Sequence, residues 1–234
     1  MARVLVFLAI LALDSSSTLA SRARVESASP MGKGGPGATC TPGRPQFCQM
    51  PDPSGSAYTS QIDSAYPFDS GVVDDYVADF SCYVYAMEWW GQYWNYPVTP
   101  GTVDYYVVTF YLDDGNCYPG SMVSMQNVSV FTETYEPVND WYHVTASITP
   151  VDLLAGRRYW VEIQGCMVFK EEGLWGWQTC IEEGGDCGGP LQGFPLLGIP
   201  YWTEREAVGV AFCLYTWGWI AVDESSVSAV KSLY

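Results

Sequence analysis

Short apolar and aromatic segments, separated by turn residues, dominate the sequence from residue 57 onward and most constrain its fold. The segment 105–112 reads YYVVTFYL and is almost entirely apolar, as expected for a strand that is buried on both faces. Gly, Pro, Asn and Asp gather between such segments, as in DDGN at 113–116, and these residues favour tight turns. About nine segments follow each other without a helical pattern between them. We therefore predict an all-β fold, an antiparallel β-sandwich that is jelly-roll-like.

The composition supports this prediction and excludes several functions. The chain has 234 residues, which suits a single sandwich domain, and it contains 17 Tyr, 10 Trp and 23 Gly. Aromatic residues favour strands and Gly favours turns, so a helical bundle is disfavoured. Acidic residues number 26 and basic residues 10, for a formal net charge of −16. We expect neither nucleic acid nor an anionic membrane surface as a partner, because each attracts a basic face.

The first 56 residues differ from the rest of the chain. Residues 1–20 combine a basic Arg3, a short apolar stretch and small residues before the predicted cleavage site, a pattern typical of a secretory signal peptide. The apolar stretch is too short to cross a bilayer, so we expect a secreted, extracellular protein with no membrane span, attached to the cell surface if at all. Residues 21–56 are rich in Gly and Pro and form an arm or linker. The predicted sandwich domain covers 57–220, and 221–234 form a C-terminal tail.

Eight cysteines in an exported chain predict a disulfide-stabilised domain. The chain has one histidine, His143, and no CxxC pair, so the spacing does not fit a structural zinc site. We expect all eight cysteines to be paired, although the sequence leaves the connectivity open. The two short loops Cys40–Cys48 and Cys180–Cys187 close at the lowest entropic cost and are our preferred pairs. The full set is Cys40, Cys48, Cys82, Cys117, Cys166, Cys180, Cys187 and Cys213.

Three motifs occur in an order that is similar to a loose family of secreted bacterial jelly-roll domains. They are VADF at 77–80, MEWWGQY at 87–93 and FYLDDGNCYPG at 110–120, where the family has VADDF, VxWWGxY and FYDDxxGxPG. The resemblance extends over about 75–215, and it implies a sandwich fold in an extracellular setting rather than a particular activity. The chain departs from the family by lacking a second Asp before Phe80 and by its added cysteines.

The last residues of the chain resemble a short sorting tag of exported bacterial proteins. The segment SVSAVKSLY at 226–234 matches the pattern TxWGxxKxLYR at Lys231, Leu233 and Tyr234, but has Val227 in place of the Trp and lacks the final Arg. A frayed C-terminus is the alternative. If the tag is real, it implies sorting to the cell surface or release from it.

The aromatic segment at 89–96 is the first candidate for a ligand or interface site. On a strand, Trp89 and Tyr93 point to one face and Trp90 and Trp94 to the other. We expect Trp89 in the core, and Trp90 exposed together with Trp94 and Tyr96 as an interface or a platform for sugars. Because the family keeps this motif as part of its fold, burial of both faces is the preferred alternative.

Two acidic groups are candidate Ca²⁺ ligands. The first group is Asp74, Asp75 and Asp79, which lie along one segment, and the second is Asp113, Asp114 and Asn116, which share one turn. Ca²⁺ takes about six to eight oxygen ligands, and neither group contains a complete calcium-binding loop. Ordinary turn chemistry on a solvated acidic face is therefore the preferred interpretation, with Ca²⁺ as the alternative.

We name no catalytic residue, because the sequence selects no pair of carboxylates and His143 has no nucleophile motif nearby. We expect a non-enzymatic structural or adhesive protein of the cell surface or an extracellular assembly. It would associate with itself through the arm or the Trp90 and Trp94 face, as filaments if that contact is open-ended, or with other surface proteins. The alternative is a carbohydrate-binding module that binds polysaccharide through an aromatic platform, and a glycoside hydrolase comes third.

Overall fold

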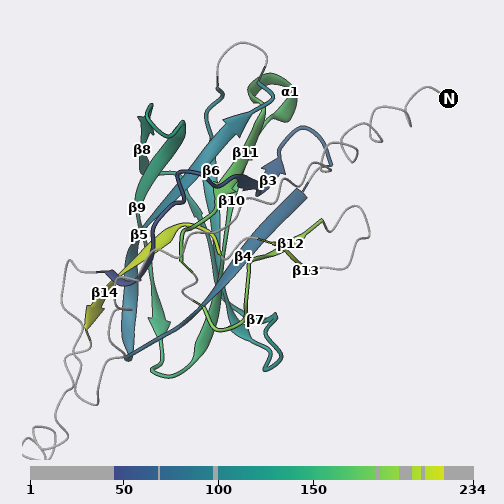
Figure 1. Cartoon of the computed structure of the whole chain (residues 1–234). Coiled ribbons are helices and arrows are strands. Elements are labelled where there is room, and N and C mark those ends of the chain that lie inside the picture. Colours follow the sequence, from purple (N-terminus) through teal and green to yellow (C-terminus); the bar gives the residue numbers. More distant parts are fainter. Residues whose placement is uncertain are drawn as a thin grey trace, which may run out of the picture. The chain divides into compact units, whose positions relative to one another are not determined.

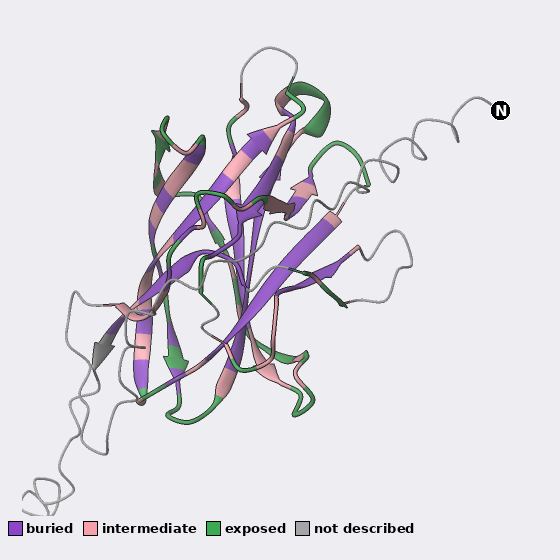
Figure 2. Cartoon of the chain, in the orientation of Figure 1, coloured by how far each residue is buried: buried purple, intermediate pink, exposed green. Residues whose placement is uncertain are grey.

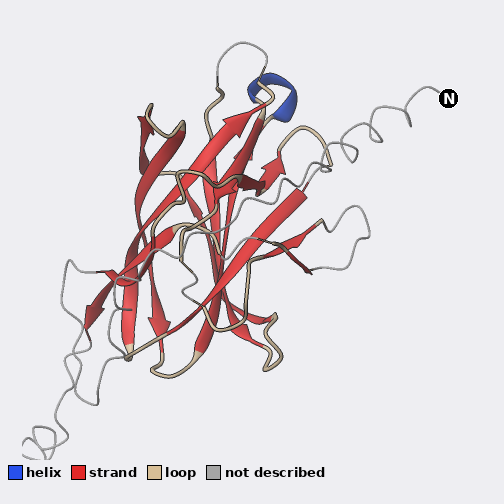
Figure 3. Ribbon diagram, viewed as in Figure 1, coloured by secondary structure: helices blue, strands red, loops and turns tan. Residues whose placement is uncertain are grey.

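The computed structural model describes residues 45–67, 69–96, 100–182, 185–194, 202–206 and 209–218. Fourteen strands and one short helix, α1 (Phe169–Glu172), lie in this part of the chain, and the predicted all-β fold is confirmed (Figures 1 and 3). The predicted signal peptide, residues 21–44 of the arm and residues 219–234 lie outside the described residues. No helix in the described part is long and apolar enough to cross a membrane.

Two seven-stranded sheets form the sandwich, and we name each after a central strand. The β5 sheet contains β1 (Pro45–Gln49), β2 (Ala57–Thr59), β5 (Cys82–Trp94), β8 (Phe131–Glu136), β9 (Trp141–Leu153), β11 (Leu174–Gln178) and β14 (Phe212–Gly218). The β10 sheet contains β3 (Gln61–Asp63), β4 (Asp69–Val77), β6 (Tyr105–Asp113), β7 (Pro119–Val128), β10 (Arg158–Met167), β12 (Leu191–Gly193) and β13 (Thr203–Glu204).

Neighbouring strands are antiparallel with one exception in the described part. Strand β5 pairs with β9 on one side, and on the other side it pairs first with β14 and then with β11. Strand β10 lies between β6 and β4, and its last residues pair with the short β3 in parallel. Strand β7 pairs with β6 at the edge of the β10 sheet. The prediction of about nine strands was too low because six strands have only two to five residues, too few to show an alternating pattern.

The hydrophobic core lies between the two sheets, where Figure 2 shows the buried residues. Trp89 of β5 packs edge-on against Tyr106 of β6, with ring centroids 4.9 Å apart, and Tyr106 also contacts Trp175 of β11. Five consecutive residues, 106–110, are buried, so the apolar segment is buried on both faces as predicted. Large aromatic side chains from both sheets therefore fill the core.

The two disulfide bonds in the described part differ from the predicted pairs. Cys48 of β1 is bonded to Cys213 of β14, and Cys117 is bonded to Cys187. Cys48 and Cys213 are direct partners in the register of β1 and β14, so sheet pairing, rather than a short loop, brings them together. Cys40 lies outside the described residues.

The expectation that all eight cysteines are paired is also wrong. Cys166 and Cys180 carry buried free thiols, and Cys82 is buried as well. Cys166 is at the end of the apolar strand β10, and Cys180 follows β11, so both act as small hydrophobic residues. An even number of cysteines in the sequence therefore does not imply complete pairing.

Part of the predicted arm belongs to the sandwich. Strand β1, within the range 21–56, pairs with β14 along residues 45–49. The Pro51 backbone forms an isolated bridge with Cys180, and the Asp52 N–H donates a hydrogen bond to the Thr179 carbonyl oxygen. Pro45, Pro51 and Pro53 obscure the short strand in the sequence, and residues 45–52 therefore belong to the sandwich.

Candidate functional site

The aromatic strand β5 does not present the predicted platform. Trp89 lies in the core as expected, but Trp90 on the opposite face is only 5% exposed. Trp90 stacks on His143 of β9, with ring centroids 4.7 Å apart, and belongs to a small buried cluster with Trp141 and the disulfide residue Cys213. The expectation that Trp90 is exposed is therefore wrong, because the disulfide and its neighbours cover the outer face of β5 here.

The other two residues of the predicted platform are separated from Trp90. Trp94 is half-buried, and a Cβ added at Gly176 would overlap its ring, so Trp94 lies directly over this glycine of β11. Tyr96 follows the strand and is 39% exposed. Trp90, Trp94 and Tyr96 therefore do not form one exposed surface.

The first predicted calcium group is divided between two faces of β4. Asp74 is buried toward the β5 sheet, where it accepts hydrogen bonds from Gln49 Nε2 (2.9 Å) and from the Val210 N–H (2.8 Å). Burial raises the pKa of Asp74 to about 7. Asp75 is buried on the opposite face, and Asp79 is exposed. The three carboxylates do not converge on one point, so they cannot share a cation.

A guanidinium group joins the second predicted calcium group to Asp75. Arg158 of β10 lies 3.1 Å from Asp75 through Nε, 3.8 Å from Asp113 through Nη1 and 3.5 Å from Asp186 through Nη2. Asp114 instead accepts backbone hydrogen bonds within its own turn, the shortest from the Asn116 N–H at 2.7 Å. No group of three or more His, Cys, Asp or Glu in the described part is arranged to hold a metal ion.

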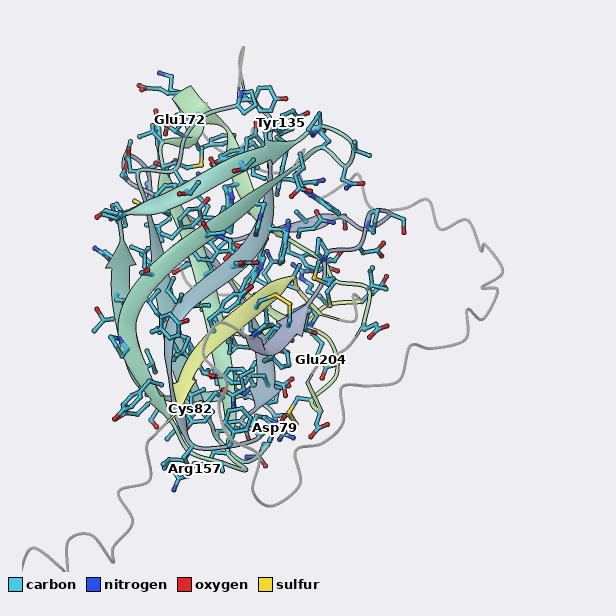
Figure 4. All side chains as sticks on the ribbon, turned by 90° about the vertical axis from the view of Figure 1, so that its left-hand side faces the viewer. Asp79, Cys82, Tyr135, Arg157, Glu172 and Glu204 are labelled. Carbon is cyan, nitrogen blue, oxygen red and sulfur yellow. A yellow bond between two sulfur atoms is a disulfide. The ribbon has the colours of Figure 1, made fainter. Side chains whose placement is uncertain are left out.

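A shallow groove of about 470 Å³ lies on the outer surface of the β5 sheet, the surface that faces the viewer in Figure 4. Glu88 of β5 lies on its floor and accepts a hydrogen bond from the hydroxyl of Tyr215 of β14 (2.9 Å). His143 lies next to the groove, with Nε2 at 3.3 Å from Glu88 Oε2. The groove is wide and open, and hydroxyl side chains line it: Thr132, Thr145 and Ser147.

A smaller hollow of about 160 Å³ lies on the outer surface of the β10 sheet. Gly71 of β4 and Gly193 of β12 are register partners here, and neither has a side chain to fill the surface. We call this site the glycine hollow. Its lining residues are Asp69, Gly71, Thr109, Tyr111, Met122, Met125, Glu162, Gln164, Gly193 and Trp202.

The floor of the glycine hollow is polar. Glu162 of β10 is 7% exposed, and Tyr111 donates a hydrogen bond of 2.6 Å to its Oε2 atom. A Cβ at position 71 would overlap Glu162 Oε1, so only glycine leaves room for this carboxylate. Gln164 Nε2 donates a hydrogen bond of 2.7 Å to Asp69 Oδ1. Burial raises the pKa of Glu162 to about 7, and it also raises the pKa of Asp69.

None of these residues was selected from the sequence. Glu162 interrupts the apolar segment YWVEI at 159–163, and a carboxylate in a buried strand is a signal that could have identified it. Gly71 and Gly193 also lie inside strands, where glycine often marks a close approach. The pairing of the two glycines needs the three-dimensional register, and the sequence does not contain it.

No protein-family model matches the chain, and no curated protein or solved structure is significantly similar to it. Its function is therefore argued from its surfaces.

Proposed function

We propose that the chain is an exported, non-enzymatic adhesive protein whose copies associate through strand β7. This strand is at an edge of the β10 sheet, and no other strand in the described part pairs with its outer side. It has ten residues, PGSMVSMQNV, and none of them is charged. Met122, Val123 and Met125 expose 55%, 40% and 58% of their surfaces. The long, uncharged open edge is the observation that supports this proposal.

An open edge strand presents unpaired N–H and C=O groups to any other strand. Proteins protect such edges with short strands and charged side chains. Edge strands β1 and β2 have only five and three residues. Strand β13 has two residues and includes Glu204, and β8 carries Glu133 and Glu136.

Register shifts against β6 affect the first half of β7, whereas residues 124–128 stay in regular register with 106–110. Within this second half, the Gln126 side chain exchanges two hydrogen bonds with the Thr149 backbone of β9. The edge is therefore open around Met122, Val123 and Met125, and we place the added strand there.

Charge favours β7 as the place where two copies meet. The chain has a formal charge of −16, so most surfaces of two copies repel each other. The repulsion is smallest along an uncharged strand, and added salt screens the remainder. Antiparallel pairing of β7 with β7 of a second copy uses the same surface twice and closes at a dimer. The two disulfides suit an oxidising, extracellular environment for such an assembly.

Light scattering coupled to size-exclusion chromatography tests this function with two matched variants. Val123→Lys places a charge on the exposed edge strand, whereas Val130→Lys places the same charge in the turn after β7, where Val130 is 84% exposed. We expect a dimer that strengthens with salt for the unchanged protein and for Val130→Lys, and a monomer for Val123→Lys. A monomer at every salt concentration for the unchanged protein, or an undisturbed dimer for Val123→Lys, would contradict the proposal.

A further inference from the structure

We propose that the glycine hollow binds one ring of a neutral sugar. The hollow shares Met122 and Met125 of β7 with the proposed interface, but it lies on the outer face of the β10 sheet, whereas an added strand would pair along the edge of β7. Val123 is not among the lining residues, so loss of the dimer in Val123→Lys and loss of sugar binding are separate outcomes. Five strands and the residue Trp202 contribute to the hollow, so a rigid sheet supports the site rather than a single loop.

The hollow is built into the sheet by its backbone. The register places Gly71 opposite Gly193, so two neighbouring strands lack side chains at the same point. Glu162 uses this space, since its Oε1 atom stands where a Cβ of residue 71 would be. The buried carboxyl group of Glu162 therefore lines an open depression. A buried carboxyl group is uncommon unless hydrogen-bonding partners compensate for its loss of hydration.

The polar groups of the hollow fit the hydroxyl groups of a sugar. Glu162 Oε2 accepts the Tyr111 hydroxyl at 2.6 Å, and no other side chain in the described part contacts this carboxylate by a hydrogen bond. Asp69 accepts one bond from Gln164 at 2.7 Å and keeps further acceptor capacity. Adjacent hydroxyls of a pyranose both donate and accept hydrogen bonds. Burial raises the pKa of Glu162 to about 7, so near neutral pH its carboxyl group can donate or accept a hydrogen bond.

The apolar side of the hollow fits the C–H face of a sugar ring. Trp202 and Tyr111 supply aromatic surface, and Met122 and Met125 of β7 supply flexible thioether chains. Aromatic side chains beside buried hydrogen-bonding groups can orient a sugar, because the sugar ring has one polar edge and one apolar face.

Charge and size narrow the class of ligand. The lining contains two carboxylates and no Lys, Arg or His, so phosphate, sulfate and uronic acids are repelled. Its volume of about 160 Å³ is below the roughly 300 Å³ at which sites for drug-sized ligands begin. It therefore accepts a single ring, such as a free monosaccharide or the terminal unit of a chain. A single ring makes few contacts, so we expect a dissociation constant on the order of 1 mM.

Saturation-transfer NMR with the whole purified protein tests this inference. The probes are the methyl glycosides of glucose, galactose and mannose at pH 7, with glucuronic acid as the anionic comparison and glucosamine as the cationic one. We expect saturation transfer to at least one neutral glycoside and none to glucuronic acid. Transfer to glucosamine alone would overturn the inference and assign the hollow to ammonium groups, and no transfer to any neutral glycoside would also overturn it.

Matched variants locate the site. Trp202→Ala removes the aromatic wall and is expected to abolish the signal, and Glu162→Gln is expected to weaken binding about tenfold, the effect of one hydrogen bond. Glu88→Gln is the control, because Glu88 also accepts a tyrosine hydroxyl but lies on the opposite sheet. Binding that survives in both Trp202→Ala and Glu162→Gln, or that is lost equally in Glu88→Gln, would show that the sugar binds elsewhere.

Discussion

Arg158 Nε lies 3.1 Å from Asp75 Oδ2, and this ion pair holds a fully buried carboxylate at the outer face of the β10 sheet. Arg158 is 24% exposed, so it reaches Asp75 from the surface. The Asp186 N–H donates a further hydrogen bond of 3.1 Å to the same carboxylate. Burial raises the pKa of Asp75, while the Asp186 bond and the Arg158 charge act in the opposite direction.

The first prediction concerns this ion pair. Arg158→Leu leaves the charge of Asp75 buried without its cation, and we expect the free energy of unfolding to fall by about 3–5 kcal/mol. Arg157→Leu, one residue earlier, removes an exposed arginine and is expected to change stability by less than about 0.5 kcal/mol. Urea denaturation measures both. Equal effects of the two substitutions would show that the Asp75 contact is unimportant for stability.

The second prediction concerns the two tryptophans of β5. Both Trp89 and Trp90 are buried, on opposite faces of the strand, so Trp89→Ala and Trp90→Ala should each lower the free energy of unfolding by about 3–5 kcal/mol. Tyr96→Ala serves as the control because this residue is 39% exposed, and it should have a much smaller effect. An unchanged denaturation midpoint for Trp90→Ala would contradict the burial of Trp90 and would support an exposed aromatic platform.

The third prediction concerns the dependence of stability on pH. Burial raises the pKa of Glu162 from 4.5 in the unfolded chain to about 7 in the folded protein. Between these values the folded state binds the extra proton, so the stabilisation is complete below pH 4.5 and is lost as the pH rises through about 7. Glu162→Gln does not titrate here, and it should become more stable relative to the unchanged protein over this interval. A stability difference that does not vary with pH would contradict the raised pKa.

The fourth prediction concerns the thiols. Cys166 and Cys180 are each 2% exposed, and burial raises the pKa of the Cys180 thiol, so neither should react with iodoacetamide in the native protein. Both should react after unfolding in urea without a reductant, as peptide mass spectrometry can show. Under the same conditions the disulfide residues should stay unlabelled; they are Cys48, Cys117, Cys187 and Cys213. Absence of label on Cys166 and Cys180 in urea would instead indicate that they are paired.

The fold class could be predicted from the sequence because the longest strands have clear patterns of apolar and aromatic residues. Residues 105–112 are apolar in succession and belong to the buried strand β6, and the alternation of Trp89 and Trp90 places them on opposite faces of β5. Burial of both faces of β5 was the preferred alternative, and it is the arrangement found. The short strands β2, β3, β12 and β13 could not be predicted, because a few residues pair only when the sheet beside them already exists.

Residues that meet across the sandwich could not be predicted for a different reason. Loop entropy favours Cys40–Cys48, but the register of β1 and β14 sets Cys48 against Cys213. Likewise, adjacent aspartates suggest a shared cation, whereas the alternation of β4 turns Asp74 and Asp75 away from each other. The glycine hollow forms because strand pairing sets Gly71 opposite Gly193, and this register arises only when the sheet has formed. The candidate site is therefore visible only in the folded chain.

The disulfide between Cys48 and Cys213 has a mechanical consequence. It joins the first and last described strands, with a sequence separation of 165 residues. A pulling force applied to the chain before Cys48 and after Cys213 passes through the covalent bond instead of through the sandwich. The residues between the two cysteines cannot be extended while the bond is intact, so tension does not unravel the sheets or expose their core. A protein that holds surfaces together under shear would keep its shape, and only the segments outside the bond would lengthen.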